Sequence, residues 1–205
     1  MRNSNTFRRS SVFAAEKELV SQSKELCRDF IHSRIIREGL SWSKVEPDLP
    51  APHGTLEDVS SVLRKLGDEL EYMRPYVYRN IAKQLNISVA VEAVVSEAFL
   101  SVATEILSMG ITWGKVVAIY AVAAGLSVDC VRQGHPVMVH TIVDSLGEFV
   151  HRSLVPWLKK RGGWGDISKC VVNMDSSAHA RAHWLSAAVL TWRQILKTMY
   201  IYLTK

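Results

Sequence analysis

The feature that most constrains this chain is a run without charge in its second half. Between Val116 and Val128 there is not one Asp, Glu, Lys or Arg. A helix over Gly114–Val131 would be about 27 Å long, close to the roughly 30 Å hydrocarbon thickness of a bilayer. Such a helix must be wrapped by other helices or placed in lipid. The run therefore predicts a helical protein that is able to enter a membrane conditionally.

A second long helix is expected directly after this one. The tight connection Gln133-Gly134-His135-Pro136 ends one helix, and Pro136 suits the start of the next. An apolar stripe then recurs at helical spacing: Val139, Ile142, Val143, Leu146, Phe149, Val150 and Leu154. Because the connection is short, the two helices are predicted to be antiparallel neighbours, forming a hairpin.

Composition limits the class of protein. The chain has 205 residues, 48% apolar and 22% charged, which suits one globular domain with a sizeable core. Its net charge of +5 favours anionic surfaces such as phospholipid headgroups, and no nucleic-acid-binding motif is present. The three cysteines are widely spaced and form no CxxC pair, which predicts buried thiols in a reducing compartment.

Helix signals dominate the whole chain, and no segment alternates like a strand. Besides the hairpin, helices are expected at about Ala14–Glu38, Leu56–Arg74, Tyr76–Leu85, Val91–Met109, Trp164–Val172 and His183–Leu203. We therefore predict an all-α bundle of eight or nine helices around the apolar hairpin. Its domain organisation is a flexible N-terminus over 1–13, a helical domain over 14–182 with a loop at 41–55, and a C-terminal helix over 183–205.

Three local motifs follow one another along this pattern. The first is an amphipathic helix with an apolar face, a glycine for close backbone approach and an adjacent carboxylate: Val59, Leu63, Leu66, Gly67, Asp68 and Leu70. The second opens the uncharged helix: Trp113, Gly114, Lys115 and Val116. The third follows the hairpin: Trp157, Gly162, Gly163 and Trp164.

In this order and spacing, the motifs resemble the third, first and second homology motifs of the Bcl-2 family of apoptosis regulators. The resemblance runs from about Phe13 to the C-terminus and implies a Bcl-2-like helical bundle. Two positions depart from the family pattern: Thr112 stands where most members have Asn, and Lys115 where most have Arg. In survival members that Arg pairs with an Asp of a captured helix. Lys is a point charge, so recognition through Lys115 should be weaker or differently oriented.

The resemblance implies a pro-apoptotic effector that oligomerises in intracellular membranes, permeabilises them and promotes cytochrome c release. Its implied partners are a second copy of itself, other Bcl-2 family members through the groove and the third-motif helix, and anionic phospholipid. Its implied locations are the cytosol, mitochondrial outer membrane, endoplasmic reticulum and Golgi. The residues expected to enter the bilayer are Val116, Ile119, Ala124, Gly125, Leu126, Leu146 and Phe149.

Two other functions stay open at this point. A survival-type member would sequester homology-motif helices in its groove without forming pores, and a helical adaptor would use the same stripe for packing alone. Trp113, Trp157 and Trp164 are either core aromatics or interfacial anchors, and the core role is favoured. The basic run 159–161 is either a solvated helix end or a secondary lipid contact.

The last segment is predicted to be a marginal membrane anchor. Residues 184–203 are long enough to span, and Trp184, Leu190 and Trp192 contribute apolar area. Arg193 near the middle and Lys197 one turn on oppose insertion, each by about 2.5–3.5 kcal/mol. The segment therefore either spans with helix partners or lies along the interface. No catalytic or nucleotide-binding motif appears, so no enzyme, cofactor or metal is expected.

Overall fold

A computed structural model of the chain describes residues 3–43 and 55–170, and all the regular elements in these ranges are helical. They are α1 (Asn3–Arg37), α2 (Thr55–Met73), α3 (Ile81–Gln84), α4 (Glu92–Leu107), α5 (Trp113–Arg132), α6 (Met138–Phe149), the π-helix η1 (Val150–Leu154), α7 (Val155–Arg161) and the 3-10 helix η2 (Trp164–Ile167). The predicted all-α bundle is confirmed.

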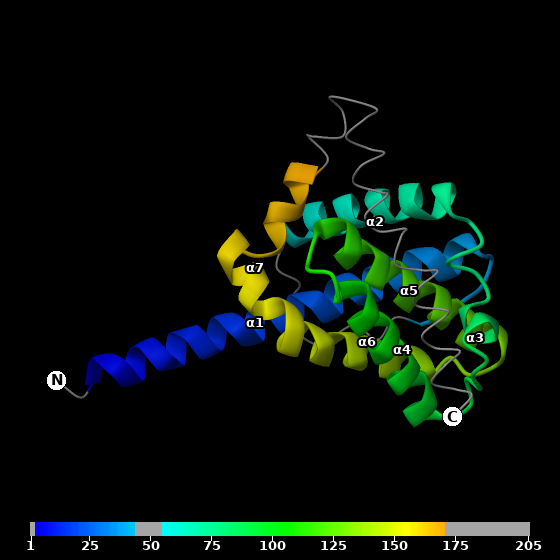
Figure 1. Ribbon diagram of the computed structural model, residues 1–205, viewed down its shortest axis with the longest axis horizontal. Helices are drawn as coiled ribbons and strands as arrows, with labels where there is room; N and C mark the ends of the chain where they lie inside the picture. The colour runs from blue at the N-terminus through cyan, green and yellow to red at the C-terminus, as the bar shows by residue number, and fades with distance from the viewer. Residues whose placement is uncertain (1–2, 44–54, 171–205) are drawn as a thin grey trace.

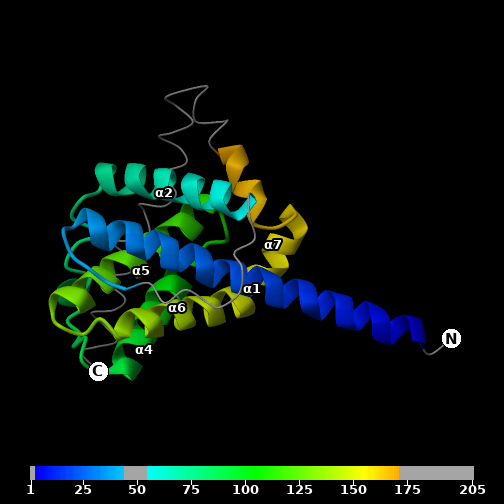
Figure 2. The same cartoon turned by 180° about the vertical axis from the view of Figure 1, so that it is seen from behind.

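Helix α5 runs through the middle of the bundle, with α1, α2, α4 and α6 around it (Figure 1). Every residue from Trp113 to Cys130 is buried, so no face of α5 reaches the surface along that length. The opposite view shows α1 and α2 covering the other side (Figure 2). The uncharged run thus lies within the protein in this conformation, enclosed by amphipathic helices.

The sequence predicted that the first helix begins near Ala14, but α1 begins at Asn3. Residues 3–13 contain neither proline nor glycine, so nothing in the chain stops the helix from extending toward the N-terminus. The extra turns project from the body of the bundle, whereas the second half of α1 packs against α5, α6 and α2 (Figures 1 and 2).

The second helix of the predicted hairpin is divided into three segments. After α6, the chain widens to a π-helix over Val150–Leu154 and then continues as α7. Pro156, in the first turn of α7, has no N–H to give to residue 152, and its ring crowds that carbonyl in an ordinary helix. The wider turn accommodates the proline while keeping Val150 and Leu154 buried.

One predicted helix is shorter than expected. Only Ile81–Gln84 is helical in 76–85, because Asn80 adopts a left-handed conformation (φ 52°) that a helix cannot contain. The helix predicted from Trp164 begins as a 3-10 turn over Trp164–Ile167 and continues as α-helix over 168–170, where the described residues end. Residues 44–54 of the predicted loop, and the predicted C-terminal helix with Trp184, Leu190, Trp192, Arg193 and Lys197, lie outside the described residues.

Candidate functional site

The apolar face of α2 is part of the core. Val59, Leu63, Leu66 and Leu70 expose 4% of their surface or less, and the face packs toward α1 and α5. The core role expected of this stripe in the folded chain is therefore what the structure shows. A partner helix or groove meets these side chains only after α2 has moved away from α1 and α5.

Gly67 is the point of closest approach between α2 and α1. A Cβ built on Gly67 would lie 2.3 Å from Cζ of Phe30, so no larger residue fits without displacing the ring. Phe30 itself stacks edge-on against Tyr120 of α5, with ring centroids 6.1 Å apart. The glycine of the third motif thus allows α2 to lie directly on an aromatic pair that links α1 to α5.

Ion pairs join the other edge of α2 to α1. Arg37 pairs with Asp68 and with Glu71, the latter at 3.0 Å. Arg34 also pairs with Glu71, and its Nε lies 3.3 Å from Oε1 of Glu38. The carboxylate of the third motif, Asp68, therefore has its partner within this chain in the present conformation.

The Arg34–Glu71 pair is the buried part of this network. The side chains expose only 4% and 11% of their surface. Burial, then the neighbouring charge of Arg37, lowers the pKa of Arg34 from its usual value. Oε1 of Glu71 is buried and accepts no hydrogen bond among the described residues. Because desolvating two charges is costly, such a pair specifies how α2 docks more than it stabilises the fold.

The network continues to α5 through Glu38. Arg132, in the last turn of α5, donates to the Glu38 carboxylate. Burial would raise the pKa of Glu38, but the Arg132 hydrogen bond and the charges of Arg34 and Arg132 outweigh it and lower that pKa. One chain of ion pairs therefore joins α2, α1 and the C-terminal end of α5.

The first motif forms the start of α5. Thr112 is the N-cap: its Oγ1 accepts a hydrogen bond from the backbone N–H of Lys115 at 3.3 Å. Thr serves here as a cap residue, as Asn also can. The Lys115 side chain is buried, its Nζ donates to the carbonyl of Gly110 at 2.9 Å, and burial lowers its pKa. The ammonium is thus directed at the α4–α5 connection rather than presented on the surface.

The second motif owes its two glycines to backbone geometry. Gly162 (φ 86°) and Gly163 (φ 96°) both lie in the left-handed half of φ space, where a side chain is strained. They close α7, with the N–H of Gly163 donating to the carbonyl of Leu158 at 2.9 Å. The reversal turns Trp164 into the core, where its Nε1 donates to the carbonyl of Leu19.

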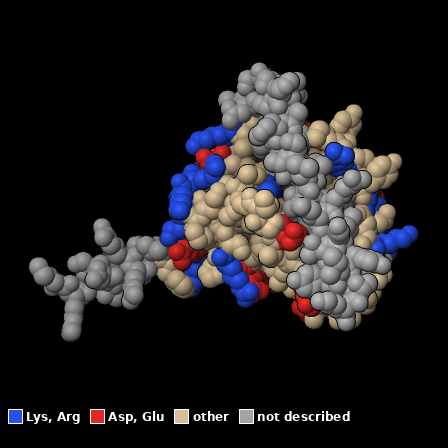
Figure 3. Space-filling view, viewed as in Figure 1, with Lys and Arg blue, Asp and Glu red and all other residues tan. Residues whose placement is uncertain are grey.

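The first and second motifs meet at the N-terminal end of α5. The ring of Trp113 lies edge-on to Trp157 with centroids 4.9 Å apart, and 6.0 Å from the ring of Trp164. Trp113 and Trp164 are fully enclosed and Trp157 is half-buried, in agreement with the core role favoured for them. Lys and Arg side chains gather on the nearby surface of α7 (Figure 3).

Asp166 is the polar centre of this aromatic cluster, and the sequence analysis missed it. Its carboxylate accepts hydrogen bonds from Lys169 Nζ (2.7 Å), Trp113 Nε1 (2.8 Å) and Arg161 Nη1 (2.9 Å). The bonds from Lys169 and Trp113, together with Arg161 and against the effect of burial, hold the pKa of Asp166 well below its usual range. One carboxylate thus links α7, η2 and the first turn of α5.

The small residues of α5 are close-packed. A Cβ on Gly125 would lie 2.5 Å from the carbonyl oxygen of Tyr78, so the turn before α3 rests directly on the α5 backbone. One turn on, the buried Asp129 carboxylate accepts from the N–H of Ala82 at 2.9 Å. Burial raises the pKa of Asp129 despite this bond. Asp129 is the one acidic residue of α5, and its place near the end of an otherwise apolar helix is the sequence signal that could have predicted a buried hydrogen bond there.

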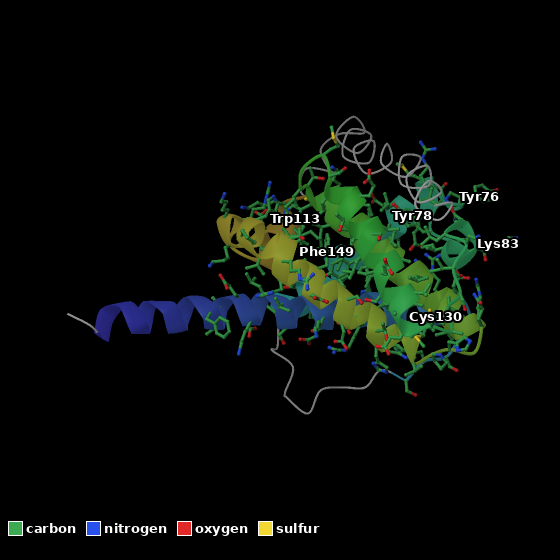
Figure 4. The ribbon with its side chains drawn as sticks, turned by 60° about the horizontal axis from the view of Figure 1, so that its bottom comes forward. Tyr76, Tyr78, Lys83, Trp113, Cys130 and Phe149 are labelled. Carbon is green, nitrogen blue, oxygen red and sulfur yellow. The ribbon has the colours of Figure 1, made fainter. Side chains whose placement is uncertain are left out.

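The structure brings the first and second motifs into contact and places the third on the flank of α5. Figure 4 shows Trp113 near one end of α5 and Cys130 near the other, with Phe149, at the end of α6, on the Trp113 side. The hairpin residues predicted to enter lipid are all in the core: Val116, Ile119, Ala124, Gly125, Leu126, Leu146 and Phe149. Among the described residues no three His, Cys, Asp or Glu side chains form a metal-binding group.

Known proteins resemble this chain in sequence and in structure. Residues 63–164 match the family of apoptosis regulator proteins described as Bcl-2. The chain is 80% identical over 212 residues to Bcl-2-related ovarian killer protein homolog B of Danio rerio, covering 98% of this chain and 100% of that protein. These matches confirm the resemblance inferred from the motifs.

Solved structures agree. The crystal structure of chicken BOK superposes with a TM-score of 0.68 at 64% identity, covering 76% of this chain and 97% of that one. The crystal structure of Trichoplax adhaerens trBcl-2L2 bound to trBak BH3 superposes with a TM-score of 0.65 at 25% identity, covering 73% of this chain and 97% of that one.

Proposed function

This chain belongs to the Bcl-2 family of apoptosis regulators, and we propose that it is a pro-apoptotic effector that permeabilises intracellular membranes. It moves from the cytosol to the mitochondrial outer membrane, endoplasmic reticulum or Golgi, pairs with further copies of itself and forms oligomers that release cytochrome c. The name "killer protein" of its 80% identical relative supports a pro-apoptotic direction over a survival one.

The observation that carries this proposal is helix α5. Among the described residues it is the one helix with the length and apolarity to cross a membrane. The buried core helix of a soluble bundle has the same length and apolarity, so what distinguishes α5 is that it carries no polar face. Because α5 has no polar face, any rearrangement that uncovers it leaves lipid, or another apolar surface, as its favourable environment.

The third-motif helix supplies the route by which copies pair. Its stripe is apolar and its Gly67 allows close approach, which suits an amphipathic helix in a groove. The C-terminal segment, with Trp184, Leu190 and Trp192 against Arg193 and Lys197, would hold the protein at the membrane as a marginal anchor.

Dye release from vesicles tests the proposal directly. Purified full-length protein is added to dye-loaded vesicles of phosphatidylcholine and an anionic phospholipid, with and without a peptide of a third homology motif. Release is the expected result. The Leu63→Glu variant should lose release. Because Leu63 is also buried in the folded chain, its circular dichroism spectrum and Tm are compared with those of the unaltered protein before its release is interpreted. If no condition causes release by the unaltered protein, the effector proposal is wrong.

A survival-type receptor is the second candidate, and one observation favours it: a relative of this fold is seen bound to a BH3 segment. This function predicts tight capture of third-motif peptides without release. The position of Lys115 argues against it, because the ammonium bonded to Gly110 is not free for a ligand carboxylate. Titrating a third-motif peptide by calorimetry, beside the dye-release assay, separates the two functions.

A further inference from the structure

The chain between α2 and α3 forms an exposed corner of the bundle with an unusual composition. Residues 72–90 contain no Asp or Glu. The side chains of Tyr72 and Tyr76 expose 87% and 86% of their surface. We call the following exposed residues the corner surface: Tyr72, Met73, Arg74, Tyr76, Arg79 and Lys83. Figure 4 shows Tyr76 and Lys83 extending outward together, at the opposite end of α5 from Trp113.

The corner surface is held in place from below. Tyr78 is buried, and its carbonyl packs against Gly125 of α5. The side-chain amide of Gln84 donates to the carbonyls of Arg79 at 2.7 Å and Tyr76 at 2.9 Å. The turn is therefore preformed, and its outward side chains need little ordering when a partner arrives.

The three cations of the corner make no direct ion pair among the described residues. Within residues 3–43 and 55–170, no carboxylate oxygen lies within 4.0 Å of the charged nitrogens of Arg74, Arg79 or Lys83. The neighbouring ion-pair network pairs three arginines with three carboxylates: Arg34, Arg37 and Arg132 with Glu38, Asp68 and Glu71. Arg79 adds only a longer-range attraction to Glu38, which contributes to the lowered pKa of that carboxyl. In Figure 3, Lys and Arg side chains protrude from the right-hand side of the molecule, where Figure 1 places α3.

We propose that the corner surface is where the folded protein first docks on an anionic phospholipid bilayer. Tyrosine rings favour the headgroup level of a membrane, and the three cations match its negative surface potential. A nucleic acid could stack its bases on the tyrosines and pair with the cations, and an acidic protein could pair with the cations, so the choice of a bilayer comes from the membrane function proposed above. The inference rests on the proposed function for its choice of a membrane as partner.

Vesicle binding without leakage measures this contact. The full-length protein is floated with vesicles of phosphatidylcholine alone, or of phosphatidylcholine with 30% phosphatidylserine, at low salt. Each cation near an anionic surface contributes about a fivefold gain in partitioning, so R74Q/R79Q/K83Q should lower binding to the anionic vesicles about a hundredfold. The matched control K17Q/K65Q/R152Q makes the same charge change on exposed residues elsewhere and should retain binding within about threefold.

A site-specific label gives an independent readout. An environment-sensitive dye on Y76C, in a C170S background, should shift to the blue on anionic vesicles only. The same dye on M109C should not shift at first contact, because Met109 is equally exposed (84%) but lies at the α4–α5 connection, beyond the opposite end of α5.

The outcomes separate this inference from the effector proposal. Loss of binding in the corner variant with no dye release by the unaltered protein keeps the docking surface and removes the effector function. If the unaltered protein releases dye and the corner variant binds vesicles as well as the unaltered protein does, the effector function stands and the docking surface is wrong. Equal binding losses in both triple variants, no binding by the unaltered protein, or a blue shift at M109C without one at Y76C would each overturn the docking surface.

Discussion

The ion pair between α2 and α1 gives the most specific test of how the third-motif helix is held. In the Glu71→Gln variant, Arg34 keeps its 4% exposure but loses its main carboxylate partner. Breaking a buried pair by removing one member costs about 3–5 kcal/mol. Glu38, 3.3 Å from Nε of Arg34, remains, and the new amide still accepts a hydrogen bond. We therefore expect a loss of about 2–3 kcal/mol in the free energy of unfolding.

Two measurements follow from this value. Urea unfolding followed by circular dichroism should show the loss directly, with a fall in Tm of about 5–10 °C for a chain of this size. Hydrogen exchange in α2 should quicken by a factor of roughly 30–150 where α2 opens through this contact. The matched control Glu97→Gln, on an exposed position of α4, should change stability by less than about 0.5 kcal/mol.

A double-mutant cycle isolates the pair. Arg34→Met removes the buried charge, so Glu71→Gln on that background should cost at least about 1 kcal/mol less than it does alone. If the two substitutions are additive, or if Glu71→Gln is as harmless as Glu97→Gln, the pair does not hold α2 and the reasoning about this network fails.

Three further predictions concern α5 and its ends. Gly125→Ala drives a Cβ into the Tyr78 carbonyl and should cost about 1–3 kcal/mol in a urea melt, whereas Gly165→Ala, with open space around it, should cost under about 0.5 kcal/mol. Asp166→Asn should cost about 1–3 kcal/mol at pH 7. The low folded pKa of Asp166 means that its stabilisation is present above about pH 4 and is lost as pH falls further, so the gap between the two proteins should narrow in melts from pH 5 to pH 2. Lys115→Met should change third-motif peptide affinity less than about threefold in calorimetry, because its ammonium is bonded to Gly110; a larger loss would show that Lys115 reaches the ligand.

Local patterns predicted the helices well where the pattern was long. The uncharged run between Val116 and Val128 predicted a central helix, and residues 113–130 are all buried. The short connection Gln133-Gly134-His135-Pro136 predicted the end of one helix and the start of the next, and α5 ends at Arg132 and α6 begins at Met138. The local sequence is enough for these two predictions, because each depends only on residues a few positions apart.

The failures have a different physical origin. Asp166 meets Trp113 across 53 residues, and Ala82 meets Asp129 across 47, so each contact depends on the relative placement of separate helices. A sequence shows the carboxylate but not the donor. The π-turn before Pro156 and the left-handed Asn80 are local, but each settles a competition between backbone strain and core burial that propensities do not decide.

The burial of the α2 stripe sets a condition on any activation step. Four side chains of this size contribute together about 6–12 kcal/mol through burial, which is comparable to the 5–15 kcal/mol that stabilises a whole domain. Helix α2 therefore cannot simply detach into water at equilibrium. Its stripe has to pass to another apolar surface, namely the groove of a second copy or a bilayer, as α1 and α5 are uncovered. A folded protein already docked on lipid through the corner beside α2 would have that surface within reach when the Arg34–Glu71 pair opens.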